Sequence, residues 1–355
     1  MSLRNHQTIR KRRFASTHHS VLVRFIQNLS ILVLVFTTGF ISSAFAQAPG
    51  FDSAVIKIDC DRDCLIGFGR EYIDALASKD PTRARFSRDV RFTENNVEMP
   101  LGNHGLWATV TKVREGALEV ADGETGNTSW FGIAEEHGKP VYLAARLEVA
   151  DMQITELETV VVRLPDMPKP FGNVDEVVHD PAFNEITPAD ERRSRERLIA
   201  VADGYFNTVE LNDGEIFTPF HEECGRLENG ISTTAPTSSS GNNSASIAQG
   251  CEAQFKLGIF RINKRIRERK YPIVDVERQV VVASGFFDHA NTFDRYKLSN
   301  GRELQTVLKW PNSISLLEAF KIKDGKIYRI EAVFTYVPYF MHSPFARPNT
   351  EWQTR

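Results

Sequence analysis

Residues 65–80 read LIGFGREYIDALASKD, and residues 198–213 read LIAVADGYFNTVELND. The two stretches align without a gap, and both place a tyrosine at the same position, Tyr72 in the first and Tyr205 in the second. Their apolar residues recur three or four and seven or eight positions apart, a spacing that predicts one amphipathic helix in each stretch. A helix pattern that occurs twice in one chain predicts an internal repeat.

The repeat continues beyond both helices. Residues 91–96 read RFTENN and residues 226–230 read RLENG, and LEVADMQITELE at 147–158 aligns with FKIKDGKIYRIE at 320–331. The later part of each half is rich in β-branched and aromatic residues, which predicts about four antiparallel strands per half. The predicted strands cover 107–113, 130–135, 141–149 and 154–162 in the first half, and 273–287, 303–308, 314–322 and 327–336 in the second. Helices that precede one curved antiparallel sheet make an α+β unit.

Length and composition divide the chain further. At about 150 residues per domain, 355 residues predict two domains. The proline-rich stretch LPDMPKPF predicts a linker, and a run of uncharged Ser, Thr, Asn and Gly predicts a flexible loop. The predicted organisation is a signal peptide at 1–46, a first domain at 50–165, a linker at 166–186, a second domain at 187–340 with the loop at 230–250, and a tail at 341–355.

The N-terminus carries the pattern of an export signal. Residues 1–46 hold six basic residues and no acidic one, then an apolar stretch from Ile31 to Ile41, and then AFA ahead of Gln47. This order predicts a secretory signal peptide cleaved after Ala46. The alternative is an uncleaved membrane anchor, but the unbroken apolar run is shorter than the roughly 20 residues that span a bilayer. We expect a periplasmic or secreted protein with no stable membrane insertion after cleavage.

Removing the signal changes the charge of the protein. The remainder carries 37 basic and 46 acidic residues, a net charge of −9. Nucleic acids and anionic membranes bind proteins through clustered Lys and Arg, so we expect neither as a partner. The basic run FRINKRIRERK at 260–270, which reads as a helix, is more typical of a solvated or internally paired face than of a binding site.

All four cysteines, Cys60, Cys64, Cys224 and Cys251, lie in the predicted exported part. An oxidising compartment favours two disulfides over free thiols. Three pairings are open, and local pairing of Cys60 with Cys64 and of Cys224 with Cys251 is the simplest. A zinc site is the alternative, but the cysteine spacing and the scattered histidines do not match common zinc ligand patterns. We expect no metal site.

The repeat also carries a family resemblance. Tyr72, Asp80 and the Thr93-Glu94-Asn95 phrase, followed by Tyr205, CGRLENG at 224–230 and Cys251, resemble a secreted fungal and bacterial domain family of unknown function. More broadly, the repeat resembles tandem SnoaL-like or nuclear-transport-factor-2-like domains of the cystatin-like cone fold. The resemblance implies two tandem cone-shaped domains, each with N-terminal helices packed on a curved sheet. Some cone-fold enzymes isomerise, cyclise, dehydrate or cleave hydrophobic substrates without a cofactor, and other members only bind or dimerise.

Candidate catalytic residues in the first half lie near the expected cone pocket. His104, between glycine residues and near Trp107, could act as general base with Glu94 as its partner. Tyr72 or Asn95 could donate a hydrogen bond to an oxyanion, and Trp107 could contact a substrate. The alternative is structural: Glu94 and Asn95 cap a turn, and His104 is a surface loop residue.

The second half offers a parallel set. Arg226 and Glu228 would share one face of a strand, where they could bind a substrate together with Tyr205 and Asn229, although structural pairing of the two charges is more common. His289 ends the run VVVASGFFDH and could stand at a pocket mouth as a further catalytic residue.

These residues lead to one functional hypothesis and one alternative. The chain lacks a GxSxG elbow, a glycine-rich phosphate loop and an HExxH motif, which removes the main support for serine hydrolases, nucleotide-binding proteins and zincins. The leading hypothesis is an exported, cofactor-independent lyase or isomerase that acts on a small hydrophobic compound, such as an aromatic or polyketide-like molecule. The alternative is a non-catalytic module that binds a small molecule or a protein. The two domains could also associate through their sheet faces as an intramolecular pseudo-dimer.

Overall fold

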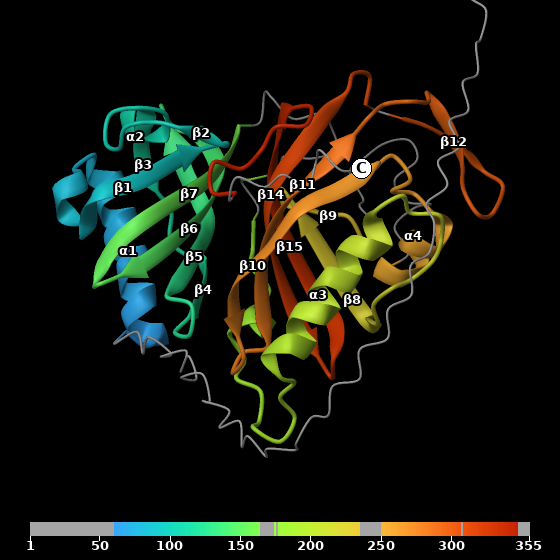
Figure 1. Ribbon diagram of the computed structural model, residues 1–355, viewed down its shortest axis with the longest axis horizontal. Helices are drawn as coiled ribbons and strands as arrows, with labels where there is room; N and C mark the ends of the chain where they lie inside the picture. Colours follow the sequence, from blue (N-terminus) through green and yellow to red (C-terminus); the bar gives the residue numbers. More distant parts are fainter. Residues whose placement is uncertain (1–59, 164–173, 175–176, 235–249, 307, 347–355) are drawn as a thin grey trace, which may run out of the picture. The chain divides into compact units, whose positions relative to one another are not determined.

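The computed structural model describes residues 60–163, 174, 177–234, 250–306 and 308–346. The predicted signal peptide lies outside these residues, as do residues 166–173, 175 and 176 of the predicted linker, residues 235–249 of the predicted loop and residues 347–355 of the tail. The described residues form two large β-sheets and few helices (Figure 1). The predicted α+β class is therefore confirmed.

The two predicted amphipathic helices both form. Helix α1 (Arg62–Ser78) is capped by Asp61, whose carboxylate accepts the Cys64 amide hydrogen, and helix α3 (Arg195–Val209) is capped by Ser194. Each cap satisfies a backbone N–H that has no partner inside its helix. Helix α1 lies along strands of the first sheet and α3 along strands of the second (Figure 1). The apolar spacing in the sequence thus becomes one buried face on each helix.

The first sheet has the strand order β2-β1-β7-β6-β5-β3, with β4 paired to β5. A short 3-10 helix (Pro81–Arg83) follows α1, and helix α2 (Leu106–Thr109) precedes β3. The strands are β1 (Phe86–Glu94), β2 (Val97–Glu98), β3 (Val110–Val113), β4 (Leu118–Asp122), β5 (Asn127–Glu136), β6 (Lys139–Ala150) and β7 (Gln153–Arg163).

The second sheet has the order β9-β8-β15-β14-β11-β10. A 3-10 helix (Pro181–Asn184) precedes α3, and helix α4 (Cys251–Leu257) precedes β10. The strands are β8 (Phe220–Glu228), β9 (Ile231–Ser232), β10 (Arg265–Asp275), β11 (Val280–His289), β14 (Asn312–Lys323) and β15 (Lys326–Pro338). A separate small sheet pairs β12 (Arg295–Lys297) with β13 (Glu303–Gln305).

The order of strands is the same in both large sheets, apart from the extra β4. Most neighbouring strands are antiparallel, as the sequence predicts, but β1 pairs with β7 and β8 with β15 in parallel. The prediction of a purely antiparallel sheet is therefore wrong for one pair in each half. The members of each parallel pair are separated by the other strands of their half, so no tight hairpin forces them to run in opposite directions.

Four predicted elements differ in the structure. The single strand predicted at 273–287 is divided by a turn at 276–279 into the end of β10 and most of β11. The predicted strand at 107–113 begins as helix α2 and becomes strand β3 only at Val110. The predicted helix at 260–270 is a turn followed by β10, because Arg265 and Arg267 face Asp288 on the neighbouring strand while Ile266 is buried. Tertiary pairing overrides local helix propensity here. Part of the predicted strand at 303–308 is β13, which lies outside the large sheet.

Contacts join the two sheets. Strands β4 to β7 of the first sheet contact β10 and β15 of the second, and apolar residues of both sheets belong to one buried cluster. Asp122 in β4 binds Arg195 of α3 and accepts the backbone N–H of Val274 in β10 at 2.9 Å. Tyr142 in β6 donates to Glu331 in β15, which also lies 2.5 Å from Nδ1 of His179. Both apolar packing and buried polar groups therefore connect the halves.

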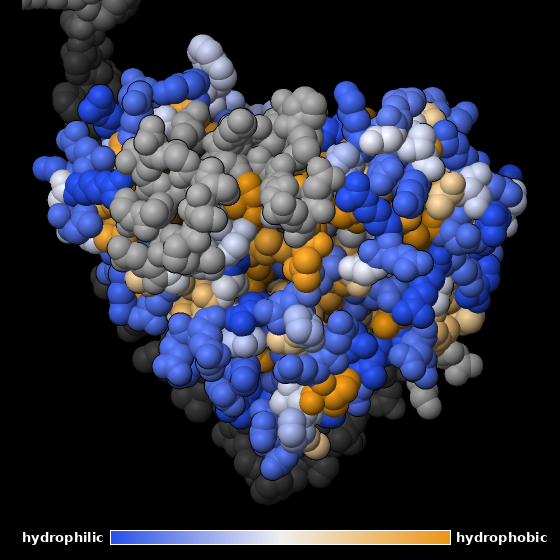
Figure 2. All heavy atoms as spheres, turned by 180° about the vertical axis from the view of Figure 1, so that it is seen from behind, coloured by the Kyte–Doolittle hydropathy of each residue, from blue (hydrophilic) through white to orange (hydrophobic). Residues whose placement is uncertain are grey.

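The surface is largely hydrophilic on the face seen in Figure 2, where hydrophobic residues show mainly near the centre. The large apolar side chains that are exposed in the described part of the chain belong to different segments: Val97, Met152, Val178, Ile186, Leu211, Phe217, Trp310 and Tyr339. Single exposed apolar residues are common on soluble domains. A small-molecule site therefore has to be sought among cavities rather than on an apolar face.

Candidate functional site

The predicted aromatic residues of the first half are packed. Tyr72 and Trp107 are each about 1% exposed, and their ring centroids lie 6.0 Å apart. Burial and the nearby Glu94 carboxylate both raise the pKa of Tyr72 well above its ordinary value, so its hydroxyl stays protonated. The two rings form part of the core beneath α1.

Glu94 binds groups of its own half. Its carboxylate accepts the Leu106 amide hydrogen at 2.6 Å and a hydrogen bond from Arg163 at 2.9 Å. A Cβ on Gly105 would lie 2.2 Å from Glu94 Oε2, so the loop can approach only because position 105 is glycine, with φ at +57°. Glu94 therefore holds the start of α2 in place.

Asn95 and Asn229 occupy matching positions. Both have a positive φ at the end of a strand. The Asn95 amide donates to Val161 O and accepts from Val161 N, and the Asn229 amide makes the same pair of bonds with Phe334. Each side chain thus extends a parallel strand pairing by one step, which occupies the groups that were predicted to bind substrate.

His104 is exposed in the turn before α2, and the structure describes no hydrogen bond from its ring to another described residue. It is not brought within hydrogen-bonding distance of Glu94 or Tyr72. The predicted catalytic arrangement in the first half is therefore not assembled in the structure, and a catalytic role for His104 stays a prediction.

The second half contains a buried polar cluster. Arg226 is about 3% exposed and donates to Glu228 at 2.7 Å and to Gln254 of α4 at 3.1 Å. Glu228 also accepts from Thr233 at 2.5 Å. The structure brings Arg226 and Glu228 together as predicted, and it places Tyr205 beside them.

Glu318 belongs to the same cluster, although no sequence motif singled it out. It is about 2% exposed, and its Oε2 has no hydrogen-bond partner among the described residues. Burial, followed by the negative charge of Glu228, raises the pKa of Glu318 to about 8, while Arg226 and Tyr205 act in the opposite direction. Glu318 lies within a strand of mostly apolar residues, where one acid among Leu and Ala was the available signal.

His289 ends β11, as predicted, and is held between two amides. Its Nδ1 lies 3.0 Å from Asn312 Oδ1, and its Nε2 lies 2.7 Å from the side-chain amide of Asn263. Burial lowers the pKa of His289 to about 4, so the ring is neutral near pH 7. The neighbouring Asp288 is bound by Arg265, Arg267 and Ser313 and does not pair with His289.

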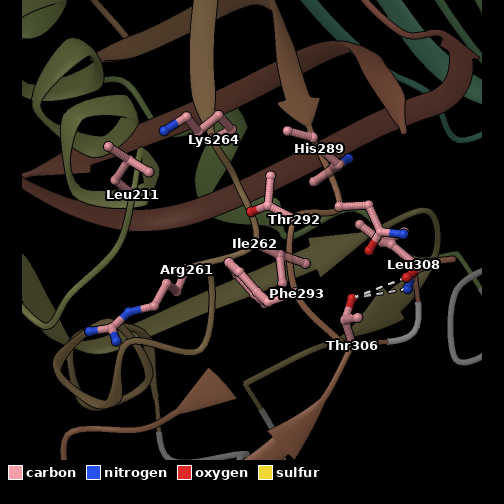
Figure 3. A pocket seen from close by; sticks show the side chains of 11 residues that line it. Leu211, Arg261, Ile262, Lys264, His289, Thr292, Phe293, Thr306 and Leu308 are labelled. Atoms are coloured by element: carbon pink, nitrogen blue, oxygen red, sulfur yellow. Dashed lines mark hydrogen bonds between the residues drawn. The ribbon is translucent and has the colours of Figure 1, made fainter. Parts of the chain in front are cut away.

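A cavity of about 110 Å³ opens beside His289. It is formed by four segments: the end of α3, the residues before β10, the residues after β11 and the residues before β14 (Figure 3). Its walls combine apolar side chains with Thr hydroxyls and two cations, from Leu211, Arg261, Ile262, Lys264, His289, Ala290, Asn291, Thr292, Phe293, Thr306 and Leu308. A partly enclosed, mostly apolar cavity with a few polar groups is the common form of a small-molecule site.

An insertion builds half of this cavity. In the first half, β5 and β6 are joined by the tight turn His137-Gly138, both with positive φ. At the matching place in the second half, residues 290–311 intervene between β11 and β14 and carry the small β12 and β13 pair. The two ends of this insertion supply Thr292, Phe293 and Thr306 to the cavity wall.

Leu211 lines the cavity in an unusual conformation. Its φ is +49°, and its side chain is about 50% exposed although it is large and apolar. A left-handed backbone is costly for such a residue and occurs where the surrounding structure compensates for it. Sequence reasoning placed Leu211 only at the end of a helix and missed it as a site residue, because positive φ leaves no signal in the sequence of a leucine.

Two disulfides form between cysteines that are near each other in the sequence, Cys60 with Cys64 and Cys224 with Cys251, which is the simplest of the three predicted pairings. Within the described ranges, no group of three His, Cys, Asp or Glu residues is arranged to hold a metal ion. In the same ranges, no helix has the length and apolar character needed to cross a membrane.

One family model matches a part of the chain that lies within the second half. Residues 191–334 match a domain of unknown function, DUF8021. No curated protein matches the chain.

Three solved structures are similar to part of the chain. The first is a protein from Sphaerobacter thermophilus, with 19% identity over 28% of this chain and 95% of that one and a TM-score of 0.22. The second is an NTF2-like protein of unknown function from Cytophaga hutchinsonii, with 14% identity over 28% of this chain and 92% of that one and a TM-score of 0.23. The third is AclR from Streptomyces galilaeus, a proposed hydroxylase, with 16% identity over 31% of this chain and 90% of that one and a TM-score of 0.19. Each match covers less than a third of this chain.

Proposed function

We propose that this protein binds a small molecule in the cavity beside His289. The observation that carries the proposal is the cavity itself. The two large described sheets have matching strand order, but only the second has the insertion that completes the wall of the cavity. Leu211 supports it, because a strained backbone holds an apolar side chain at the wall. An engineered cavity of about 150 Å³ takes up benzene, so about 110 Å³ suits a compact ring or short chain.

Binding is the better supported of the two hypotheses. Among the described residues, His289 contacts two amides and no carboxylate, and His104 is exposed. Neither histidine therefore has Glu94, Glu228 or Tyr72 as a partner for acid–base chemistry. A neutral, doubly hydrogen-bonded histidine is suited to shaping a cavity wall.

The test is native mass spectrometry of small molecules retained by the purified protein, together with ligand-observed NMR against a set of compact compounds. We expect wild-type protein to bind a molecule that Ala290→Phe and Thr292→Phe do not bind, because either ring would fill the cavity. Ala150→Phe, at an exposed position outside the cavity, is the matched control. Thermal unfolding establishes that all variants are folded. Binding that survives both cavity variants, or that is absent from wild type in both measurements, contradicts the proposal.

A second candidate is the lyase or isomerase activity, and Glu318 is the observation that favours it. A carboxyl group with its pKa raised to about 8 is largely protonated at neutral pH and could donate a proton, with the Tyr205 hydroxyl beside it. This candidate requires a route for substrate to side chains that are almost fully buried. His104, Glu94 and His289 remain the catalytic residues predicted from the sequence.

Glu318→Gln tests whether this acid is protonated in the folded protein. Between pH 4.5 and about 8 the folded state holds a proton that the unfolded state has released, so wild-type stability falls as pH rises through this window. The neutral variant lacks this loss, and we expect it to be more stable than wild type at pH 9, by on the order of 4 kcal/mol, but not at pH 4. Urea unfolding at both values measures the difference. If the variant is equally destabilised at both, Glu318 is charged and this candidate loses its support.

Export and domain organisation complete the proposal. Cleavage after Ala46 would yield an exported protein beginning at Gln47, and the two disulfides support an oxidising compartment. The matching strand order supports two tandem cone domains, and the contacts between the sheets support their association as a pseudo-dimer. N-terminal sequencing of the exported protein tests the cleavage site.

A further inference from the structure

Residues 341–346 follow β15 and form neither helix nor strand. Three cations of the two large sheets donate to backbone carbonyls of this segment at 2.5 to 2.7 Å: Arg267 to Met341, Arg91 to Pro344 and Lys270 to Phe345. Glu268 accepts the Ser343 amide hydrogen at 2.9 Å. A segment held in this way by side chains, rather than by a β-ladder, can detach without unfolding a sheet.

Phe345 places its ring against two arginines. The guanidinium carbons of Arg91 and Arg146 lie 4.9 and 5.0 Å from the ring centroid. Arg146 is about 5% exposed, and Glu156 at 2.7 Å and Glu158 at 2.9 Å fix its orientation. Contact between a cation and an aromatic face is favourable, and more so where the cation is removed from water. The place of Phe345 therefore favours an aromatic ring over another apolar group of its size.

A cavity of about 770 Å³ lies beside this ring. Phe345 forms part of its wall, and so do Arg91, Arg146 and Lys270, which hold Phe345. The remaining wall comes from both large sheets and from α3, and it shares no described lining residue with the cavity beside His289. Small-molecule sites commonly have volumes of about 300–1,000 Å³, so this cavity is large enough even while Phe345 is in place.

Charge alone does not select a ligand for this cavity, because Glu148 and Glu156 line it together with the cations. The contacts of Phe345 are more specific. They combine an aromatic ring on two guanidinium groups with a carbonyl oxygen that accepts from Lys270 at 2.7 Å.

We propose that this cavity is a second ligand site, which takes a small aromatic compound with a carbonyl group beside its ring, and that such a ligand displaces Phe345. This inference is independent of the cavity beside His289. The ligand ring would contact Arg91 and Arg146, and its carbonyl oxygen would accept from Lys270. A tethered group competes at an effective concentration in roughly the millimolar range, so Phe345 would exclude weak ligands and yield to tighter ones.

The test uses N-acetylphenylalaninamide and N-acetylleucinamide, which carry the same carbonyl groups and differ in the ring. Ligand-observed NMR titrates both compounds into wild-type mature protein and into Phe345→Ala. We expect Phe345→Ala to bind the phenylalanine compound about tenfold more tightly than wild type does, because the competing ring is gone. The leucine compound should bind about fivefold more weakly than the phenylalanine compound, because it lacks the contact with the arginines.

Matched variants separate this site from general effects. Tyr339→Ala removes a nearby aromatic side chain outside the described lining of the cavity and should bind as wild type does. In the Phe345→Ala background, Arg91→Gln should weaken binding of the phenylalanine compound. Arg88→Gln, at an exposed position of the same strand and outside the described lining, should not. Thermal unfolding establishes that the variants are folded.

Hydrogen exchange gives a measurement that needs no variant. When the phenylalanine compound is bound to wild type, the amide hydrogens of 341–346 should exchange faster, because the segment has detached. The inference is wrong if this exchange is unchanged in the complex, if wild type and Phe345→Ala bind equally tightly, or if the leucine compound binds as well as the phenylalanine compound. It is also wrong if no form of the protein binds the phenylalanine compound. Each of these outcomes leaves the cavity beside His289 unaffected.

Discussion

Burial favours the neutral form of two side chains in the second half. His289 is neutral because its ring is buried between Asn263 and Asn312, which cannot compensate for the lost hydration of a charged ring. Glu318 holds its proton because it is buried near the negative Glu228. His289 lowers the free energy of unfolding as pH falls, and Glu318 lowers it as pH rises. Single substitutions can therefore separate the two effects.

His289 predicts a loss of stability on acidification. The unfolded histidine takes up a proton near pH 6.5, whereas the folded one does so only near pH 4, so the unfolded state binds more protons between these values. The free energy of unfolding therefore falls as pH drops through this window, by on the order of 3 kcal/mol. His289→Gln should remove most of this dependence in urea unfolding at pH 4.5 and 7. His104→Gln, which changes an exposed histidine, is the control, and an unchanged slope in His289→Gln contradicts the assignment.

Strand ends show how one side chain can serve the same purpose in both halves. Asn95 follows β1 and Asn229 follows β8, and each bonds to both backbone groups of a residue in the long last strand of its sheet. A positive φ at both positions explains why asparagine, which tolerates this conformation, is found there. The asparagine shared by the repeated phrases RFTENN and RLENG therefore makes the same contact to the last long strand in each half.

Substitution of these asparagines should have matching effects. Asn95→Ala and Asn229→Ala each remove two hydrogen bonds to a buried strand and leave a less tolerant residue at positive φ, so each should lower the free energy of unfolding by about 2–3 kcal/mol. Denaturant unfolding of the two variants side by side measures this. Asn300→Ala is the control, because Asn300 lies in an exposed turn, where its side chain accepts the amide hydrogen of Arg302. A large effect in only one half would mean that the two positions are not equivalent.

The whole molecule is held by covalent links within each half and by contacts between the sheets. The Cys60–Cys64 bond closes a short loop at the start of α1, whereas Cys224–Cys251 spans 27 residues and ties β8 to α4. Between the halves, Tyr142 and His179 share Glu331, and Asp122 binds across to α3 and β10. Such buried groups are costly to leave unpaired, so they favour one arrangement of the sheets.

Loop length predicts different contributions from the two disulfides. By limiting the entropy of the unfolded chain, the Cys224–Cys251 bond should contribute about 3.5 kcal/mol to the free energy of unfolding, and the shorter Cys60–Cys64 loop about 2 kcal/mol. Cys224→Ala/Cys251→Ala should therefore destabilise the protein more than Cys60→Ala/Cys64→Ala in urea unfolding. Non-reducing peptide mapping of wild-type protein checks the pairing first. A larger effect of the short loop would show that lost packing outweighs chain entropy.

The sequence by itself determined the α+β class, both amphipathic helices, the helix-then-strands order of each half, and the simplest cysteine pairing. These depend on periodicity and on neighbours in the chain, which a sequence displays directly. It also indicated the pairing of Arg226 with Glu228, because two residues on one strand face are close by local geometry alone.

Only the tertiary structure decided the candidate site. Its lining comes from four separated segments, and their meeting depends on how the insertion at 290–311 folds against the end of α3. The same holds for the hydrogen-bond partners of three predicted site residues: Glu94 binds the start of a helix, and Asn95 and Asn229 bind strands. Burial and partner choice are set by contacts between distant residues, and no local pattern in the sequence records them.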